Sequence, residues 1–391
     1  MMRISNNAMF DQMRRHLMQN TERLMRAQEQ MATQKRFSRL SDNPIDAGRV
    51  LNLKGAVSRT DQYLRNIEQA VTAAGVQDQA AGQIHELLAR ANELLVREAN
   101  QATSTPATRE ATRIEMANLA GQLLHVANTR FDGKYVFGGH QTGQPAFAGA
   151  TAQVDGDPVQ DGTLAAAARV VDASALTYRP YEIRFTAADR FDVIDVQGGQ
   201  TILADQAYVS GEPINFAGLE ATLADGTGAP AAGMTLQIET TPAGEYLGDG
   251  RIQEVEVQPG GRTPVNMPGD RLFQGAGLAD GIDLFALMRD INQALADGDY
   301  DAIQEQLGSL ERAHEQVSSQ RSTVGARVNQ LEQVKERQAD IKLSLQVLSS
   351  NIEDIDVAEA ITELGRQQNI YEATLGAAGR IIQPSLLDFL R

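Results

Sequence analysis

The sequence contains no cysteine and no tryptophan, and only five of its 391 residues are histidine. Without cysteine, disulfide bonds, thiolate metal sites and cysteine nucleophiles are all excluded. No two histidines show the i, i+4 spacing of a zinc-binding helix motif; the five are His16, His85, His125, His140 and His314. We therefore expect no metal site, no cofactor and no catalytic centre, and hence no enzyme.

Long hydrophobic runs and a basic charge balance are also missing. No stretch approaches the roughly 20 apolar residues that span a membrane. The first twenty residues are interrupted by charge every few positions, unlike the apolar core of a cleavable signal peptide. The formal net charge of -16 argues against a nucleic-acid partner. We expect no membrane insertion, and these signals alone would favour a cytoplasmic protein.

What remains is dominated by helical patterns at both ends of the chain. Near the N-terminus, spacings of four and three place apolar residues on one helical stripe: Met13, Leu17, Leu24, Ala27 and Met31. Two later stretches, roughly residues 50–95 and 310–352, repeat apolar residues every seven positions, as coiled coils do. After Ile355 the pattern changes phase. A single helix cannot bury so narrow a stripe alone, so we expect the two ends to pair.

Local signals predict where the helices begin and end. In the loop Ser41–Asp46, Asn43 can cap a helix whose first residue is Pro44. Thr105-Pro106 predicts a further helix that ends near Asn128. Asp132-Gly133 indicates a turn, and Tyr135 to Gly139, with Gly138 and Gly139 at its end, is predicted to be a strand.

The composition changes between His140 and Asp280, where glycine, proline and threonine are frequent and helical periodicity disappears. Alternating apolar residues predict half-buried strands at 181–185, 234–238 and 255–257. Helical pattern returns at 282–295, and the turn at Asp297-Gly298-Asp299 does not continue as a calcium loop. The predicted fold class is α+β: a long antiparallel helical bundle or coiled coil formed by the N- and C-terminal segments, with a β-rich domain inserted between them.

Several motifs at the two ends resemble one known family. They are Met2-Arg3-Ile4-Ser5, Leu40-Ser41-Asp42-Asn43-Pro44, Asn128 to Gly139, Val324-Gly325-Ala326-Arg327, Asp354 to Ala360, and Ile381 to Leu390. Together they resemble the flagellin superfamily, and most of all its hook-associated protein 3 branch. The branch assignment depends on Asp42-Asn43-Pro44, where flagellins usually carry a run similar to Asp-Asp-Ala-Ala-Gly. Flagellin itself is the alternative; an adhesin or sensor, or an enzyme carried in the middle region, fits less well.

The resemblance implies a structural subunit at the junction between the flagellar hook and its filament. Its expected partners are hook-associated protein 1, flagellin, further copies of itself in a ring, and an export chaperone. The expected location is the extracellular flagellum, reached without a cleaved signal peptide. The resemblance also implies five divisions of the chain. Residues 1–40 form an assembly helix that is disordered in the monomer, and residues 341–391 form a second assembly helix. Residues 41–139 and 281–340 form the two parts of a helical rod, and residues 140–280 form a β-rich outer domain.

The same resemblance assigns the terminal stripes to contacts between subunits. The expected assembly residues are Met9, Met13, Leu17, Leu24, Met31, Ile341, Leu345, Leu348, Ile352, Ile355, Leu386, Leu387, Phe389 and Leu390. Asp42, Asn43, Pro44, Gly138 and Gly139 are expected to be structural motif residues.

Overall fold

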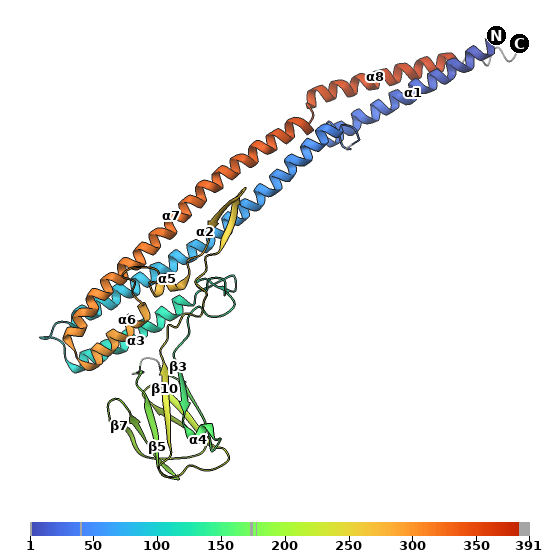
Figure 1. Ribbon diagram of the computed structural model, residues 1–391. Helices are drawn as coiled ribbons and strands as arrows, with labels where there is room; N and C mark the ends of the chain where they lie inside the picture. The colour runs from blue at the N-terminus through green and yellow to red at the C-terminus, as the bar shows by residue number, and fades with distance from the viewer. Residues whose placement is uncertain (1, 40, 173–174, 177, 383–391) are drawn as a thin grey trace. The chain divides into compact units, whose positions relative to one another are not determined.

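The computed structural model describes residues 2–39, 41–172, 175–176, 178–382 and divides into two compact units. The terminal unit comprises Met1–Arg65 and Lys335–Arg391, and the central unit comprises Asn66–Val334. Long helices come from both ends of the chain, and strands occupy its middle (Figure 1). The predicted α+β class is therefore confirmed.

The terminal unit contains a pair of antiparallel helices, α1 (Met2–Thr33) and α8 (Val357–Ile382), which pack side by side (Figure 1). A hydrogen bond from Asn20 Nδ2 to Thr374 Oγ1, 2.8 Å long, joins them. The phase change after Ile355 coincides with a break between α7 (Tyr300–Glu353) and α8. The carboxylate of Asp356 accepts hydrogen bonds from the backbone N–H groups of Ala358 and Glu359 and so caps the new helix.

Four helices share the main core of the central unit: α2 (Pro44–Glu98), α3 (Pro106–Ala127), α6 (Leu284–Asp297) and α7. The predicted starts of α2 and α3 are confirmed. Asn43 Oδ1 accepts the backbone N–H of Asp46 at the start of α2, and Thr105 caps α3 with Pro106 directly after it. Gly298, at φ 67°, ends α6, and the Asp299 carboxylate caps α7.

The strand predicted at 135–139 is only partly right. Two short strands, β1 (Arg130–Phe131) and β2 (Lys134–Tyr135), form a hairpin around Asp132-Gly133, and residues 136–139 form turns instead. Gly138 and Gly139 explain the difference: a Cβ at Gly138 would collide with the carbonyl oxygen of Gln141, and Gly139 has a φ of 66°. The backbone is too tightly folded here for a strand.

The inserted region is a two-sheet antiparallel sandwich. One sheet has the order β3-β10-β5-β6-β7 and the other the order β4-β9-β8. The strands are β3 (Thr151–Asp155), β4 (Leu164–Val170), β5 (Tyr181–Ala187), β6 (Arg190–Asp195), β7 (Thr201–Ala207), β8 (Pro213–Phe216), β9 (Leu219–Asp225) and β10 (Thr235–Thr241), with the short helix α4 (Asp157–Gln160). Inward residues of both sheets, among them Ile183 and Leu223, share one core. The strand predictions at 181–185 and 234–238 are confirmed.

The third predicted strand lies in a hairpin outside the sandwich. The hairpin pairs β11 (Glu254–Gln258) with β12 (Gly261–Pro264). Val257 packs with Ile67 of α2 and Leu331 of α7 in a separate small core. The hairpin therefore covers the seam between the two long helices within the central unit.

An aromatic cluster lies where the two chain segments that enter and leave the sandwich meet the helices. The ring of Phe147 lies within 5.1 Å, centroid to centroid, of Tyr246, Phe273 and Phe285. The hydroxyl of Tyr246 donates a 2.9 Å hydrogen bond to the carbonyl oxygen of Phe137, and burial raises the pKa of Tyr246 to about 12. The short helix α5 (Gly269–Phe273) supplies Phe273. This cluster ties the sandwich to the helical core.

Candidate functional site

The stripe predicted on the N-terminal helix is already partly covered inside the chain. Met13, Leu17, Leu24 and Met31 are half-buried, and they share the face of α1 that carries Asn20, the hydrogen-bond partner of Thr374 on α8. Ala27, on the same face, is buried. We call this the inner stripe of α1: Met13, Leu17, Asn20, Leu24, Ala27 and Met31. Its apolar residues have an internal partner in α8, in agreement with the expected pairing of the two chain ends.

The predicted residues of α7 and the segment after it differ in exposure. Ile341 and Leu348 are exposed, whereas Leu345, Ile352 and Ile355 are half-buried. The side chain of Met9 and residues Leu386, Leu387, Phe389 and Leu390 lie outside the described residues.

A second apolar face on the α1–α8 pair was not found from the sequence. On α1, the side chains of Phe10, Met18 and Met25 are 54%, 65% and 62% exposed. On α8, Val357, Ile361 and Leu375 are also exposed. We call Met18, Met25, Val357, Ile361 and Leu375 the outer apolar face; Phe10 lies about 20° around the helix from Leu17, at the edge of the inner stripe.

The outer apolar face follows its own helical register. Met18 and Met25 are seven residues apart, so at 3.6 residues per turn they lie within about 20° of each other and about 140–160° from Asn20. The seven-residue spacing was a signal in the sequence, but the inner stripe masked it. Among the described residues, twelve of the twenty exposed large apolar side chains belong to the terminal unit, so its surface is unusually apolar.

The connection from α1 to α2 and the connection from α7 to α8 are bonded to each other, and we call this region the elbow: residues 34–39, 41–44 and 353–356. The backbone N–H of Arg36 donates to the carbonyl oxygen of Glu353 over 2.7 Å, and the N–H of Ile355 donates to the carbonyl oxygen of Gln34 over 3.1 Å. Gln34 has a φ of 55°, a left-handed conformation that costs a non-glycine residue about 1–2 kcal/mol. The backbone hydrogen bonds of the elbow therefore hold Gln34 in a strained conformation.

Charged side chains reinforce the elbow. Glu353, whose side chain is only 12% exposed, accepts a 2.6 Å contact from Lys35 Nζ and a 2.8 Å contact from Lys54 Nζ. Burial opposes ionisation of Glu353, but the hydrogen bonds and charges of the two lysines outweigh it and hold its pKa below the usual value. The Glu353 carboxylate thus links the loop after α1 and the first turns of α2 to the end of α7.

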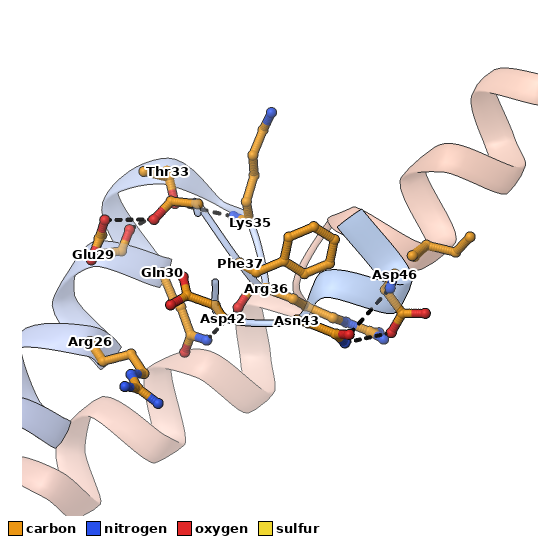
Figure 2. A pocket seen from close by; sticks show the side chains of 12 residues that line it. Arg26, Glu29, Gln30, Thr33, Lys35, Arg36, Phe37, Asp42, Asn43 and Asp46 are labelled. Carbon is orange, nitrogen blue, oxygen red and sulfur yellow. Dashed lines mark hydrogen bonds between the residues drawn. The ribbon is translucent and has the colours of Figure 1, made fainter. Parts of the chain in front are cut away.

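The motif Asp42-Asn43-Pro44 lies in this elbow, beside a pocket of about 240 Å³ (Figure 2). The side chains of Asn43 and Asp46 point toward one another, and Asn43 Nδ2 donates a 2.6 Å hydrogen bond to Asp46 Oδ2 (Figure 2). Gln30 Nε2 donates to the carbonyl oxygen of Arg36 across the loop. These two hydrogen bonds thus help to hold the loop that borders the pocket.

Substituting Glu353 by glutamine should destabilise the elbow in a pH-dependent way. At neutral pH the loss of two charge-assisted contacts should cost about 1–3 kcal/mol. Because the folded-state pKa of Glu353 is lowered, its contribution is present above the unfolded pKa and is lost as the pH falls through the folded pKa. Urea unfolding followed by circular dichroism at pH 7 and in strong acid should show the difference only at pH 7.

The matched control is Glu359→Gln, which removes the same charge from an exposed position on α8. It should leave the urea midpoint nearly unchanged, since surface substitutions are usually within about 0.5 kcal/mol. Equal midpoints for the Glu353→Gln chain and the unsubstituted chain at pH 7 would rule out the bridging role of Glu353.

The part of the chain that the structure describes contains neither a membrane-spanning helix nor a cluster of three or more metal-binding side chains. No helix there is long and apolar enough to cross a membrane. No group of three or more histidine, aspartate or glutamate side chains gathers there to hold a metal ion.

Comparisons with known proteins agree with this helical architecture. The N-terminal helical region of bacterial flagellin matches residues 4–142, and its C-terminal helical region matches residues 307–390, so that together they cover more than half of the chain. The chain belongs to the bacterial flagellin family. The inner stripe, the outer apolar face and the elbow all lie within these flagellin-family regions.

Two curated relatives within the family differ in how much of the chain they match. The flagellar hook-associated protein 3 of Salmonella typhimurium is 28% identical over 151 residues, which are 38% of this chain and 47% of that protein. The match thus spans about half the length of that relative. Flagellin A of Vibrio anguillarum is 24% identical over 92% of this chain and 91% of its own.

A solved structure supports the fold of the flagellin-family chain. It is a protein of Vibrio parahaemolyticus described as a flagellar hook-associated protein, with a TM-score of 0.50 and 14% sequence identity. The similarity covers 80% of this chain and 100% of that one.

Proposed function

We propose that this protein is a non-enzymatic structural subunit of the bacterial flagellum that assembles into the junction between hook and filament. The observation that carries the proposal is the outer apolar face of the α1–α8 pair. A folded subunit that leaves Met18, Met25 and Ile361 in water gains free energy when neighbouring subunits cover them.

The geometry supports assembly in a ring or tube more than a symmetric dimer. The inner stripe is used within the subunit, so contacts between subunits must use a different face of the same helices. Repeating one such contact from subunit to subunit gives a head-to-tail assembly, which closes into a ring or continues as a tube. In the proposed junction one side of the ring meets hook-associated protein 1 and the other side meets flagellin. The domain divisions at 40, 139, 280 and 340 belong to the same proposal.

The junction role is favoured over the filament role by the likeness to hook-associated protein 3 and by Asp42-Asn43-Pro44. The second candidate is the bulk filament subunit, because flagellin A of Vibrio anguillarum matches 92% of the chain. Both candidates would use the same outer apolar face. They differ in how many copies one flagellum contains.

Immunogold electron microscopy of isolated flagella, with an antibody raised against the β sandwich, separates the two candidates. Gold confined to a short band between hook and filament is the expected result. Gold along the whole filament would make the protein a filament subunit and refute the junction role. Flagella that carry no gold, from cells shown by immunoblot to export the protein, would refute both candidates.

A further inference from the structure

Two histidines face each other across helices α2 and α7 of the central unit. The Nδ1 atoms of His85 and His314 are 3.3 Å apart, and the two rings meet edge to face with their centroids 4.8 Å apart. The residues are 229 positions apart in the sequence, so no rule based on motif spacing could have paired them.

The distance between the two nitrogens matches that between two ligands of one tetrahedral metal ion. Nitrogens that each lie about 2.0–2.1 Å from Zn²⁺ in a tetrahedron are roughly 3.3 Å apart. The two ring nitrogens thus already have the separation that a shared metal ion requires. They come from two different helices, so one bound ion would join the helices directly.

The protonation and surroundings of the pair also suit a metal ion. Burial, and then the nearby His85, lower the pKa of His314, which favours the neutral imidazole that binds metals. His85 is exposed, so an ion can reach the pair from solvent. Asp78, which lines the same open pocket, has its two carboxylate oxygens held by Arg321 over 2.8 and 3.2 Å and is not available as a further ligand. Water therefore fills the remaining positions.

We propose that His85 and His314 form a two-histidine site for a divalent transition-metal ion such as Zn²⁺, which cross-links α2 to α7. Imidazole nitrogen suits zinc, copper and nickel ions, whereas Mg²⁺ requires oxygen ligands. Because the two histidines come together only when the helices pair, the ion binds the folded chain in preference to the unfolded chain and stabilises it.

The test is chemical unfolding of the full chain in ZnCl₂, in MgCl₂ and in a metal chelator. At a free Zn²⁺ concentration about 100 times the dissociation constant, the unfolding equilibrium constant should fall roughly 100-fold, while Mg²⁺ should have no effect. Calorimetric titration should show that His85→Gln and His314→Gln each remove one Zn²⁺-binding event. His125→Gln is the matched control, because His125 is an exposed helical histidine outside the pair, and it should retain the full Zn²⁺ effect.

Each other outcome overturns the proposal. Equal Zn²⁺ stabilisation of the His85→Gln, His314→Gln and unsubstituted chains would mean that the ion binds elsewhere. No stabilisation of the unsubstituted chain at any soluble Zn²⁺ concentration would mean that the two rings are joined only by a hydrogen bond.

Discussion

A chain with Met18→Glu and Met25→Glu should fold normally and fail to assemble. Both side chains are more than 60% exposed in the subunit, so replacing them removes little contact within it. In an assembly that covers them, each lost methionine contact costs about 1.5–3 kcal/mol. Two such losses should raise the concentration needed for assembly roughly 100-fold or more. Expressing the variant in cells that lack the unsubstituted protein should give few or no complete junctions.

The control for this variant is Gln12→Glu with Gln19→Glu. These two residues are also exposed, lie seven positions apart on the same helix, and add the same charge on a different face. They should allow assembly. Circular dichroism should show the same helix content in both double variants. Normal junctions built from the Met18→Glu, Met25→Glu chain would exclude the outer apolar face from assembly.

A substitution on the inner stripe should behave differently from one on the outer apolar face. Leu24→Glu places a charge on the half-buried side of α1 that carries Asn20, so it should weaken the α1–α8 pair before assembly begins. Its helix content should fall in the isolated subunit. The two classes of variant thus distinguish loss of folding from loss of contact between subunits.

Local chemistry is why the helix boundaries could be predicted from the sequence. The starts of α2 and α3 depend on Asn43-Pro44 and Thr105-Pro106, whose capping bonds involve residues three positions apart. The strands at 181–185 and 234–238 were equally accessible, because alternation of apolar residues is itself local. The strand at 135–139 failed because Gly138 and Gly139 meet residues that are not evident from alternation, including the side chain of Asp249.

The candidate site was harder to predict, because its contacts join distant parts of the chain. The inner stripe and the pairing of the two chain ends were predicted, but the residues that face each other were not, since Asn20 and Thr374 are 354 positions apart. The same holds for Glu353 with Lys35 and for His85 with His314. Apolar periodicity indicates that a face will be covered; which segment covers it depends on the topology of the whole chain.

Phe147→Ala should produce a large loss of stability in the central unit. Phe147 is buried against Tyr246, Phe273 and Phe285, and removing a buried phenylalanine ring costs about 3–5 kcal/mol. That is a large fraction of the roughly 5–15 kcal/mol that stabilises a typical domain. Urea unfolding of the full chain, followed by tyrosine fluorescence, should therefore show a much lower midpoint.

The matched control is Phe131→Ala, because Phe131 is an exposed phenylalanine in the β1–β2 hairpin. It should change the free energy of unfolding by less than about 1 kcal/mol.

Gly244→Ala tests the same cluster from its other side. Gly244 has a φ of 106°, and an added Cβ would collide with the ring of Phe285. If Phe147→Ala and Phe131→Ala gave the same midpoint, the aromatic cluster would not be what joins the sandwich to the helices. A low midpoint for both Phe147→Ala and Gly244→Ala, with a normal one for Phe131→Ala, would establish that the stability of the central unit depends on this aromatic joint.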